Sequence, residues 1–261
     1  MRRDFLVGIG LLASVAAGAG PAMAADIAAR PAAQPPVVAP VYVPDWVGFY
    51  VGINGGGGWG HSSFDPQNFF TETVLGVTST STPFIPPNAS PSGGVFGFQF
   101  GHNWQWGQVV GGLEIDFDGA DLKKTSTFFF PGDPFATFTS EAKIDELASA
   151  RGRLGYLIFP NWLLYGTAGM GWGHFRLNTT ETVSIPGIAS AFASNTQYAN
   201  EFGWVAGVGL EWKFWDHWLL RGEWLHYDFG RASQFDLVDG LSNVNVRTTV
   251  DVARAALSYK F

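Results

Sequence analysis

Apolar and polar residues alternate along the last sixteen residues of the chain, 246–261. Phe261, Tyr259 and Leu257 share one parity with alanines, whereas Lys260 falls on the other, more polar parity. A period of two is typical of a β-strand, because successive side chains point to opposite faces. A strand that ends on a bare aromatic residue fits a barrel whose apolar face meets lipid. We therefore predict a closing strand of a transmembrane β-barrel, with Leu257, Tyr259 and Phe261 as its signal for the barrel-assembly machinery.

Seven earlier segments show the same kind of alternation, so eight strands are expected. Long polar stretches at 61–92, 121–140, 176–197 and 230–245 alternate with short turns, and the first of them has room for a short hairpin. Bacterial outer-membrane barrels have an even number of strands, short periplasmic turns and longer external loops. The predicted fold is an all-β, eight-stranded, antiparallel up-and-down transmembrane β-barrel with four long external loops. The expected strands are 47–60, 93–104, 108–119, 143–159, 162–175, 198–214, 218–229 and 246–261.

Two positions leave the register of these strands open. The segment 162–175 is apolar and rich in glycine, so its parity is ambiguous. Strict alternation also points Asp251 toward lipid, where a carboxylate is costly. We expect Asp251 to lie near the external interface or beside a bulge; a position in the middle of the membrane would contradict the predicted register.

The N-terminal region predicts export. Arg2 and Arg3 precede a mostly apolar run, and Ala22-Met23-Ala24 offers a small-residue cleavage site, so residues 1–24 resemble a secretory signal peptide. The two arginines also resemble a twin-arginine signal, although a membrane barrel must cross the inner membrane unfolded. Residues 25–45 are rich in proline, which predicts an extended, unpacked segment. The barrel domain is expected at 46–261, and the cell outer membrane is the expected location.

Composition supports the same class and excludes others. The chain has 11 Trp and 7 Tyr, which suits aromatic girdles at two membrane interfaces. It has no Cys, so disulfide scaffolds and thiolate metal sites are excluded. The formal net charge of −7 argues against a nucleic-acid partner, which would require a basic surface. No cofactor is expected.

The polar parity of the strands places charged residues inside the predicted barrel. Eight strands leave an interior only wide enough for side chains to fill, so unpaired charges there would be costly. We expect a mutually compensating network in the lumen, with a narrow path for ions or small solutes as the alternative. Its predicted members are Glu114, Asp116, Asp118, Lys143, Arg151, Arg153, Glu211, Lys213, Arg221, Glu223 and Arg254.

Two other classes of protein remain open at this point. A barrel hydrolase would need a nucleophile, a base and an orienting group on adjacent strands. The five histidines stand in no G-x-S-x-G or H-E-x-x-H context and suit no metal site, so no catalytic or metal-binding residue is predicted. A soluble lipocalin-like cup would show the same alternation with its faces reversed. The charged polar faces and the four long loops favour the membrane barrel. The histidines are His61, His102, His174, His217 and His226.

Three ordered blocks resemble small alphaproteobacterial outer-membrane proteins, often called outer-membrane immunogenic or porin-family proteins. The first is W-V-G-F-Y-V-G-I-N at 46–54, the second R-G-R-L-G-Y at 151–156, and the third W-L-L-Y-G-T-A-G at 162–169. The resemblance covers about 31–261 and implies a transmembrane barrel of the OmpA/OmpX type. The expected function is structural, in envelope integrity, together with surface-exposed loops of antigenic or adhesive character. Expected partners are outer-membrane lipid and lipopolysaccharide, with a host or environmental ligand possible at the external loops.

Overall fold

The computed structural model describes residues 45–66, 70–74, 77–81, 90–130, 133–185, 189–236 and 243–261. The predicted signal peptide and nearly all of the proline-rich segment lie outside these residues. Within the described part, no helix is long and apolar enough to cross a bilayer. The described residues form β-strands joined by short turns.

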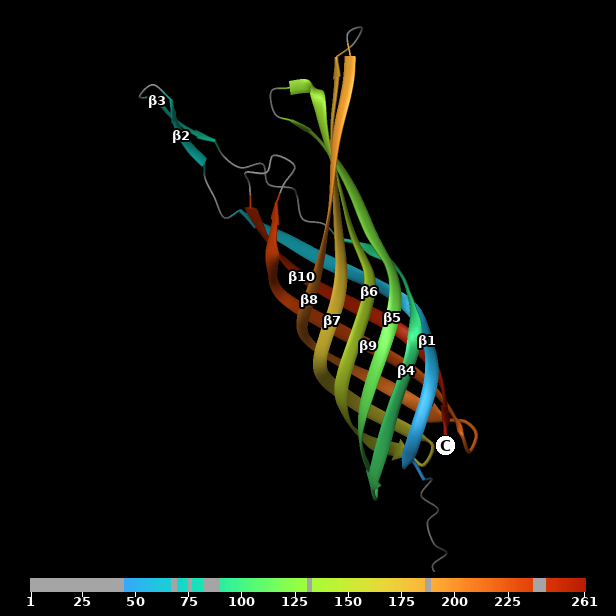
Figure 1. Cartoon of the computed structure of the whole chain (residues 1–261). Helices are drawn as coiled ribbons and strands as arrows, with labels where there is room; N and C mark the ends of the chain where they lie inside the picture. The colour runs from blue at the N-terminus through green and yellow to red at the C-terminus, as the bar shows by residue number, and fades with distance from the viewer. Residues whose placement is uncertain are drawn as a thin grey trace, which may run out of the picture. The chain divides into compact units, whose positions relative to one another are not determined.

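Eight of the strands close into an antiparallel barrel, in the order β1-β10-β9-β8-β7-β6-β5-β4 (Figure 1). The pairing of β1 with β10 closes the ring, so the terminal strand has the role that its alternation predicted. A separate hairpin, β2 (Phe70–Val74) with β3 (Val77–Ser81), lies in the first long connection. The barrel strands are β1 (Gly48–Pro66), β4 (Ser92–Trp106), β5 (Val109–Phe130), β6 (Asp133–Phe159), β7 (Trp162–Ile185), β8 (Ala189–Lys213), β9 (Trp218–Asp236) and β10 (Asn243–Lys260).

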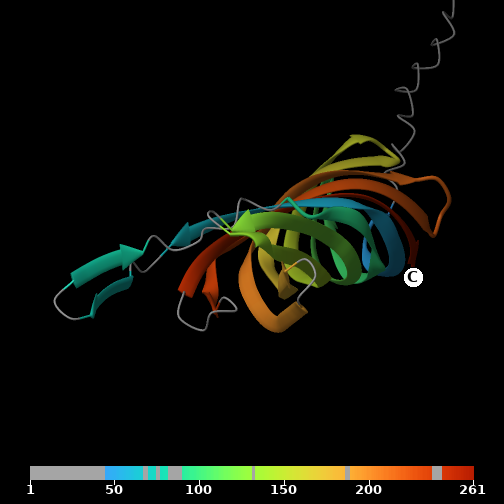
Figure 2. The same ribbon diagram turned by 90° about the horizontal axis from the view of Figure 1, so that it is seen from above.

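The register of the barrel fixes its tilt. A path across paired residues that leaves β1 at Phe49 crosses each of the other barrel strands in turn. It returns to β1 at Trp59, ten residues further along. For eight strands this stagger corresponds to a tilt of about 40° from the barrel axis. The view from above in Figure 2 shows the strands winding around the axis. The ten residues therefore rise about 25 Å, which is the height of a transmembrane apolar band.

Aromatic side chains mark both borders of this band. At the end that carries the short turns, Trp162 stacks on Trp212 with ring centroids 5.5 Å apart, and Trp218 meets Tyr259 at 5.3 Å. Trp59 and other exposed aromatic residues lie at the opposite border. The outer wall between the two girdles is apolar. Its large exposed residues include Ile53, Phe96, Phe98, Phe100, Leu113, Ile115, Leu154, Leu164, Met170, Val208 and Leu220.

Asp251 lies at the external border, where the sequence placed it. It pairs with Trp59 across the β1–β10 ladder, and its carboxylate lies 2.9 Å from Nδ1 of His226. The His226 ring is 5.5 Å from that of Trp204. A register shift follows between Arg247 and Thr249. An interfacial position with a polar partner explains how a carboxylate is tolerated on the outer wall.

The long connections are shorter in the structure than in the sequence-based prediction. Most of the predicted loop 121–140 belongs to β5 and β6, and most of 176–197 belongs to β7 and β8. These segments are rich in Thr, Ser and Asn and lack apolar alternation, because no lipid faces them. The hairpin in 61–92 was correctly allowed for. The parity of 162–175 is now settled: Leu163, Tyr165 and Thr167 face the interior.

The membrane position of the outer wall can be tested on one face of β7. Ala168 lies midway between the girdles, and Thr180 has the same parity twelve residues further toward the external end. We expect Ala168→Arg to lower the free energy of unfolding by about 2–4 kcal/mol, because a guanidinium then faces the bilayer centre. Thr180→Arg is the matched control, with little change expected because it faces water. Guanidinium unfolding in lipid vesicles measures both, and equal effects would contradict the membrane position.

Candidate functional site

The interior of the barrel holds a buried layer of charge. Four arginines and five carboxylates from five strands occupy it, and all nine residues are at most 6% exposed. They come from β5, β6, β8, β9 and β10, because inward parity places one or more of them on each of these strands. We call this set the lumen network. Its members are Glu114, Asp116, Asp118, Arg151, Arg153, Glu211, Arg221, Glu223 and Arg254.

Arg151 lies at the centre of the lumen network. Its guanidinium is 2.6 Å from Glu114, 2.9 Å from Asp116 and 3.1 Å from Glu223. Glu223 reaches it from the opposite wall of the barrel, and it also accepts two bonds from Arg254, at 2.9 and 3.1 Å. The contact between β6 and β9 therefore ties the two walls together.

A second set of contacts lies nearer the periplasmic end. Arg153 and Arg221 share Glu211, each at 2.9 Å, and Arg221 also contacts Glu114 at 2.6 Å. Both guanidiniums lie over the ring of Tyr165, at 4.2 and 5.5 Å from its centroid. Arginine stacks on aromatic faces while its edge donates hydrogen bonds, so this layer is both packed and bonded.

Arg254 completes the network on the external side. Its Nη1 is 2.5 Å from Asp118 and 3.3 Å from Asp116. Ser149 donates to Asp116 at 2.5 Å. Four arginines face five carboxylates in this layer, and each of the nine residues contacts at least one residue of opposite charge.

Two inward tyrosines complete the layer, and the list of predicted members omitted them. Tyr50 donates to Glu114 at 2.5 Å, and Tyr165 donates to Glu223 at 2.8 Å. Each tyrosine ring lies over a glycine: a Cβ on Gly101 would collide with Tyr50, and one on Gly209 with Tyr165. The inward parity of Tyr50 was visible in the sequence, but its cross-barrel partner was not.

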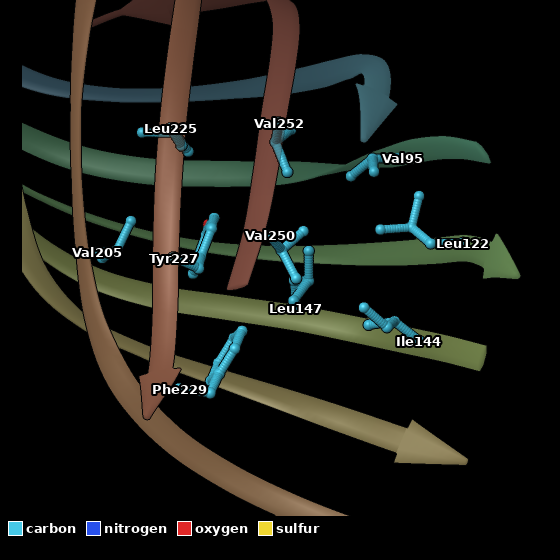
Figure 3. Close-up of a cluster of buried hydrophobic side chains, with 10 residues drawn as sticks. All are labelled: Val95, Leu122, Ile144, Leu147, Val205, Leu225, Tyr227, Phe229, Val250 and Val252. Atoms are coloured by element: carbon cyan, nitrogen blue, oxygen red, sulfur yellow. The ribbon is translucent and has the colours of Figure 1, made fainter. Parts of the chain in front are cut away.

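An apolar cluster closes the external side of the lumen network (Figure 3). Leu147, Leu225 and Val250 are fully buried in it, and Tyr227 stacks on Phe229 with centroids 5.9 Å apart. These side chains enter from six strands, so no single strand supplies the closure. The cluster consists of Val95, Leu122, Ile144, Leu147, Val205, Leu225, Tyr227, Phe229, Val250 and Val252.

A second apolar cluster closes the periplasmic side, and Trp46 is its largest member. Trp46 precedes β1 and is fully buried against Val110, Leu157, Leu163 and Leu219. Its backbone N–H donates to Oε1 of Gln105 at 2.8 Å, and its indole N–H donates to the carbonyl of Pro160 at 3.4 Å. The interior between the girdles therefore holds an apolar layer, a charged layer and a second apolar layer.

Two predicted members of the network lie elsewhere. Lys143 has the sequence parity of Arg151, but the register shifts between Ile144 and Glu146, which turns Lys143 to the outer face. There it contacts Asp121 at 3.3 Å and Asp145 at 2.8 Å. Hydrogen bonding to Lys143 lowers the pKa of Asp121, and hydrogen bonding to Asp145 and then Asp121 raises the pKa of Lys143.

Lys213 faces inward but lies at the periplasmic rim, below the network. Its Nζ donates to the carbonyl of Asp45 at 2.9 Å. Lys260 donates in the same way to the carbonyl of Val47 at 2.6 Å. The two lysines thus hold the segment on either side of Trp46 in place.

Three of the five histidines have polar partners in the described part of the chain. No group of three or more His, Asp and Glu there could hold a metal ion. His226 bonds Asp251, and Nδ1 of His174 lies 2.8 Å from Oδ1 of Asn200 on the outer face. His217 lies 2.9 Å from the carbonyl of Lys260.

Residues 10–261 match the family model described as an outer membrane protein beta-barrel domain. The chain belongs to this family. It is 33% identical over 203 residues to the 31 kDa outer-membrane immunogenic protein of Brucella melitensis, which covers 77% of this chain and 75% of the relative. It is 29% identical over 140 residues to the 22 kDa outer membrane protein of Rhizobium leguminosarum, or 54% of each. The fold class, the outer-membrane location and the sequence resemblance are thus confirmed.

Distant solved structures share less with the chain. The outer membrane protein OprG of Pseudomonas aeruginosa is 12% identical, with a TM-score of 0.45 over 82% of this chain and 96% of that one. A likeness at this level says nothing about ligands or conduction.

The lumen network can be tested by removing its central cation. Arg151→Met removes the cation that Glu114, Asp116 and Glu223 share and leaves five buried carboxylates facing three arginines, so we expect the free energy of unfolding to fall by about 3–5 kcal/mol. Lys143→Met is the matched control, since it removes a cation of the same sequence parity at a site that water screens, so its effect should be much smaller. Denaturant unfolding followed by Trp fluorescence measures both. A mild Arg151→Met variant would contradict a structural role for the network.

Proposed function

We propose that this protein is a non-enzymatic outer-membrane barrel that contributes to envelope integrity and presents its external strands and loops at the cell surface. The observation that carries the proposal is the filled lumen. The nine charged residues of the lumen network are bonded to one another between two apolar layers. The interior thus serves to stabilise the wall, and recognition is left to the outside.

The filled lumen argues against the alternative of a narrow channel. An eight-stranded barrel leaves room only for side chains, and here large ones occupy the whole length. A permeating ion would have to displace Trp46 at one end and the cluster around Leu147 and Val250 at the other. It would also have to break arginine–carboxylate contacts of 2.5–3.1 Å. Each of these steps exposes a buried charge or opens a packed apolar layer, which is costly.

The external half of the barrel supports the display role. β6, β7 and β8 have 27, 24 and 25 residues, far more than the nine to eleven or so that a tilted strand needs to cross a bilayer. The additional residues of β6, β7 and β8 extend past the external girdle as paired strands. Rigid elements that present loops commonly carry recognition. The Brucella relative is named an immunogenic protein, which agrees with a surface position.

Conductance measurements test the closed lumen. Purified protein inserted into planar lipid bilayers should give no stepwise conductance in molar salt, because no continuous aqueous path crosses the three layers. Trp46→Ala should remain silent as well, since the charged layer and the external cluster still close the lumen. Discrete, reproducible channel openings by the unaltered protein would overturn the proposal in favour of a porin-like role.

Surface display can be tested by single-cysteine labelling, because the chain contains no Cys. Ser194 lies on the exposed outer part of β8, and Asn161 lies in the short turn between β6 and β7. A membrane-impermeant maleimide applied to intact cells should label Ser194→Cys and leave Asn161→Cys unlabelled. Both variants should react after the outer membrane is permeabilised. The opposite pattern on intact cells would show that the long strands face the periplasm.

A further inference from the structure

The lumen network holds one more negative charge than positive charge. Its four arginines and five carboxylates lie between the two apolar clusters. The other buried charged side chains of the described residues lie outside this layer: Lys213 and Lys260 bond the segment at the periplasmic rim, and Asp228 bonds Arg247 toward the external end. Burial of a net charge away from water is costly, and a buried group is normally neutralised instead. The layer therefore requires one further positive charge.

The contacts within the network show where that charge is missing. Asp118 has a single arginine partner, Arg254, whose Nη1 lies 2.5 Å from its Oδ2. Its cross-strand neighbour on β6 is Leu147, a fully buried member of the external apolar cluster. Each of the other four carboxylates contacts two or three arginines; they are Glu114, Asp116, Glu211 and Glu223. Asp118 is thus the carboxylate with the fewest compensating contacts.

The second oxygen of Asp118 lies in a gap that a glycine leaves. Asn54 of β1, Gly97 of β4 and Asp118 of β5 are consecutive cross-strand partners. Oδ1 of Asp118 leans over Gly97, where a Cβ would collide with it, and so it points toward β1. The side chains of Asn54 and Asp118 interact across this gap, but no hydrogen bond of normal geometry joins them. Gly97 therefore allows these two polar groups to meet.

Both of these side chains present an oxygen that lacks a donor. The amide group of Asn54 donates to Oε1 of Gln99 at 3.1 Å, and Gln99 donates in turn to Ser258 at 3.0 Å, so the orientation of Asn54 is fixed. Oδ1 of Asn54 and Oδ1 of Asp118 are buried and accept no hydrogen bond from a described residue. Buried acceptors normally have a donor. One proton between the two oxygens supplies both the missing donor and the missing positive charge.

We propose that Asp118 holds a proton on Oδ1 and donates it in a hydrogen bond to Oδ1 of Asn54, which makes the lumen network electrically neutral. A protonated carboxyl group has one O–H donor and still accepts through its other oxygen, so the contact of Oδ2 with Arg254 is kept. Four arginines then face four carboxylates. The same hydrogen bond links β5 to β1 across the intervening strand β4.

The inference rests on the closed lumen of the proposed function, because ions from solution could neutralise an open interior. The two can fail separately, since conductance tests closure and infrared spectroscopy detects the proton. At neutral pH the full-length protein, in a detergent without carbonyl groups, should show the C=O band of a protonated carboxyl group. Asp118→Asn should lose this band. Asp121→Asn is the matched control, because it removes a water-exposed carboxylate of the same strand and should keep the band.

The hydrogen-bond acceptor is tested in the same spectrum. Asn54→Leu should move the band to higher frequency, because the O–H group of Asp118 then has no acceptor. An unshifted band would overturn the role of Asn54. The proposal as a whole would be overturned by the absence of the band from the unaltered protein, or by its persistence in Asp118→Asn.

Stability gives an independent measurement, by urea unfolding in lipid vesicles. Asp118→Asn keeps a neutral side chain that can donate to Asn54 and accept from Arg254, so its unfolding midpoint should equal that of the unaltered protein. Asp116→Asn, two residues away, removes a charge that Arg151 and Arg254 share and should lower the midpoint. Equal lowering in both variants would overturn the proposal. Exchange of sodium for choline should leave the midpoint unchanged; a fall without sodium would indicate a bound metal cation and overturn the proton.

Discussion

A bilayer offers no partner for backbone N–H and C=O groups, and this constraint determines the structure. Closure of β1 onto β10 satisfies it within the membrane, and the ten-residue stagger around the ring then sets the tilt and the interior width. The interior that results is only wide enough for the inward side chains to fill it. The lumen network and the two apolar layers on either side of it supply those side chains.

Inside the barrel, stability comes from contacts that no single strand contains. Arg151 of β6 bonds Glu223 of β9, and Arg254 of β10 reaches Asp118 of β5. Such contacts form only once the ring is closed, so they stabilise the closed barrel and a single register of its strands. A shift of one residue would turn the arginines toward lipid, where each is costly. The network thereby favours the observed register of the strands, and it also fills the lumen.

The sequence pattern predicted the membrane-spanning part of each strand, and it predicted less of the strands outside the membrane. Lipid on one face imposes a strict period of two, so all eight barrel strands and nine members of the network were found from parity. Above the girdle nothing imposes that period, and the Thr- and Ser-rich ends of β5 through β8 were taken for loops. The shift beside Asp145 reversed the parity of Lys143. Cross-barrel partners such as Tyr165 and Glu223 depend on the stagger, which alternation does not encode.

The same constraint explains why the wall opens where it does. Within the bilayer an unpaired edge would leave backbone groups without partners, so β8 and β9 must pair up to Trp204 and Asp228. Above the external girdle water can hydrogen-bond to those groups, so the bend at Gly230 that turns β9 away from β8 is tolerated there. Each of the strands β5, β6, β7 and β8 can therefore continue past the membrane, where pairing around the whole ring is no longer required.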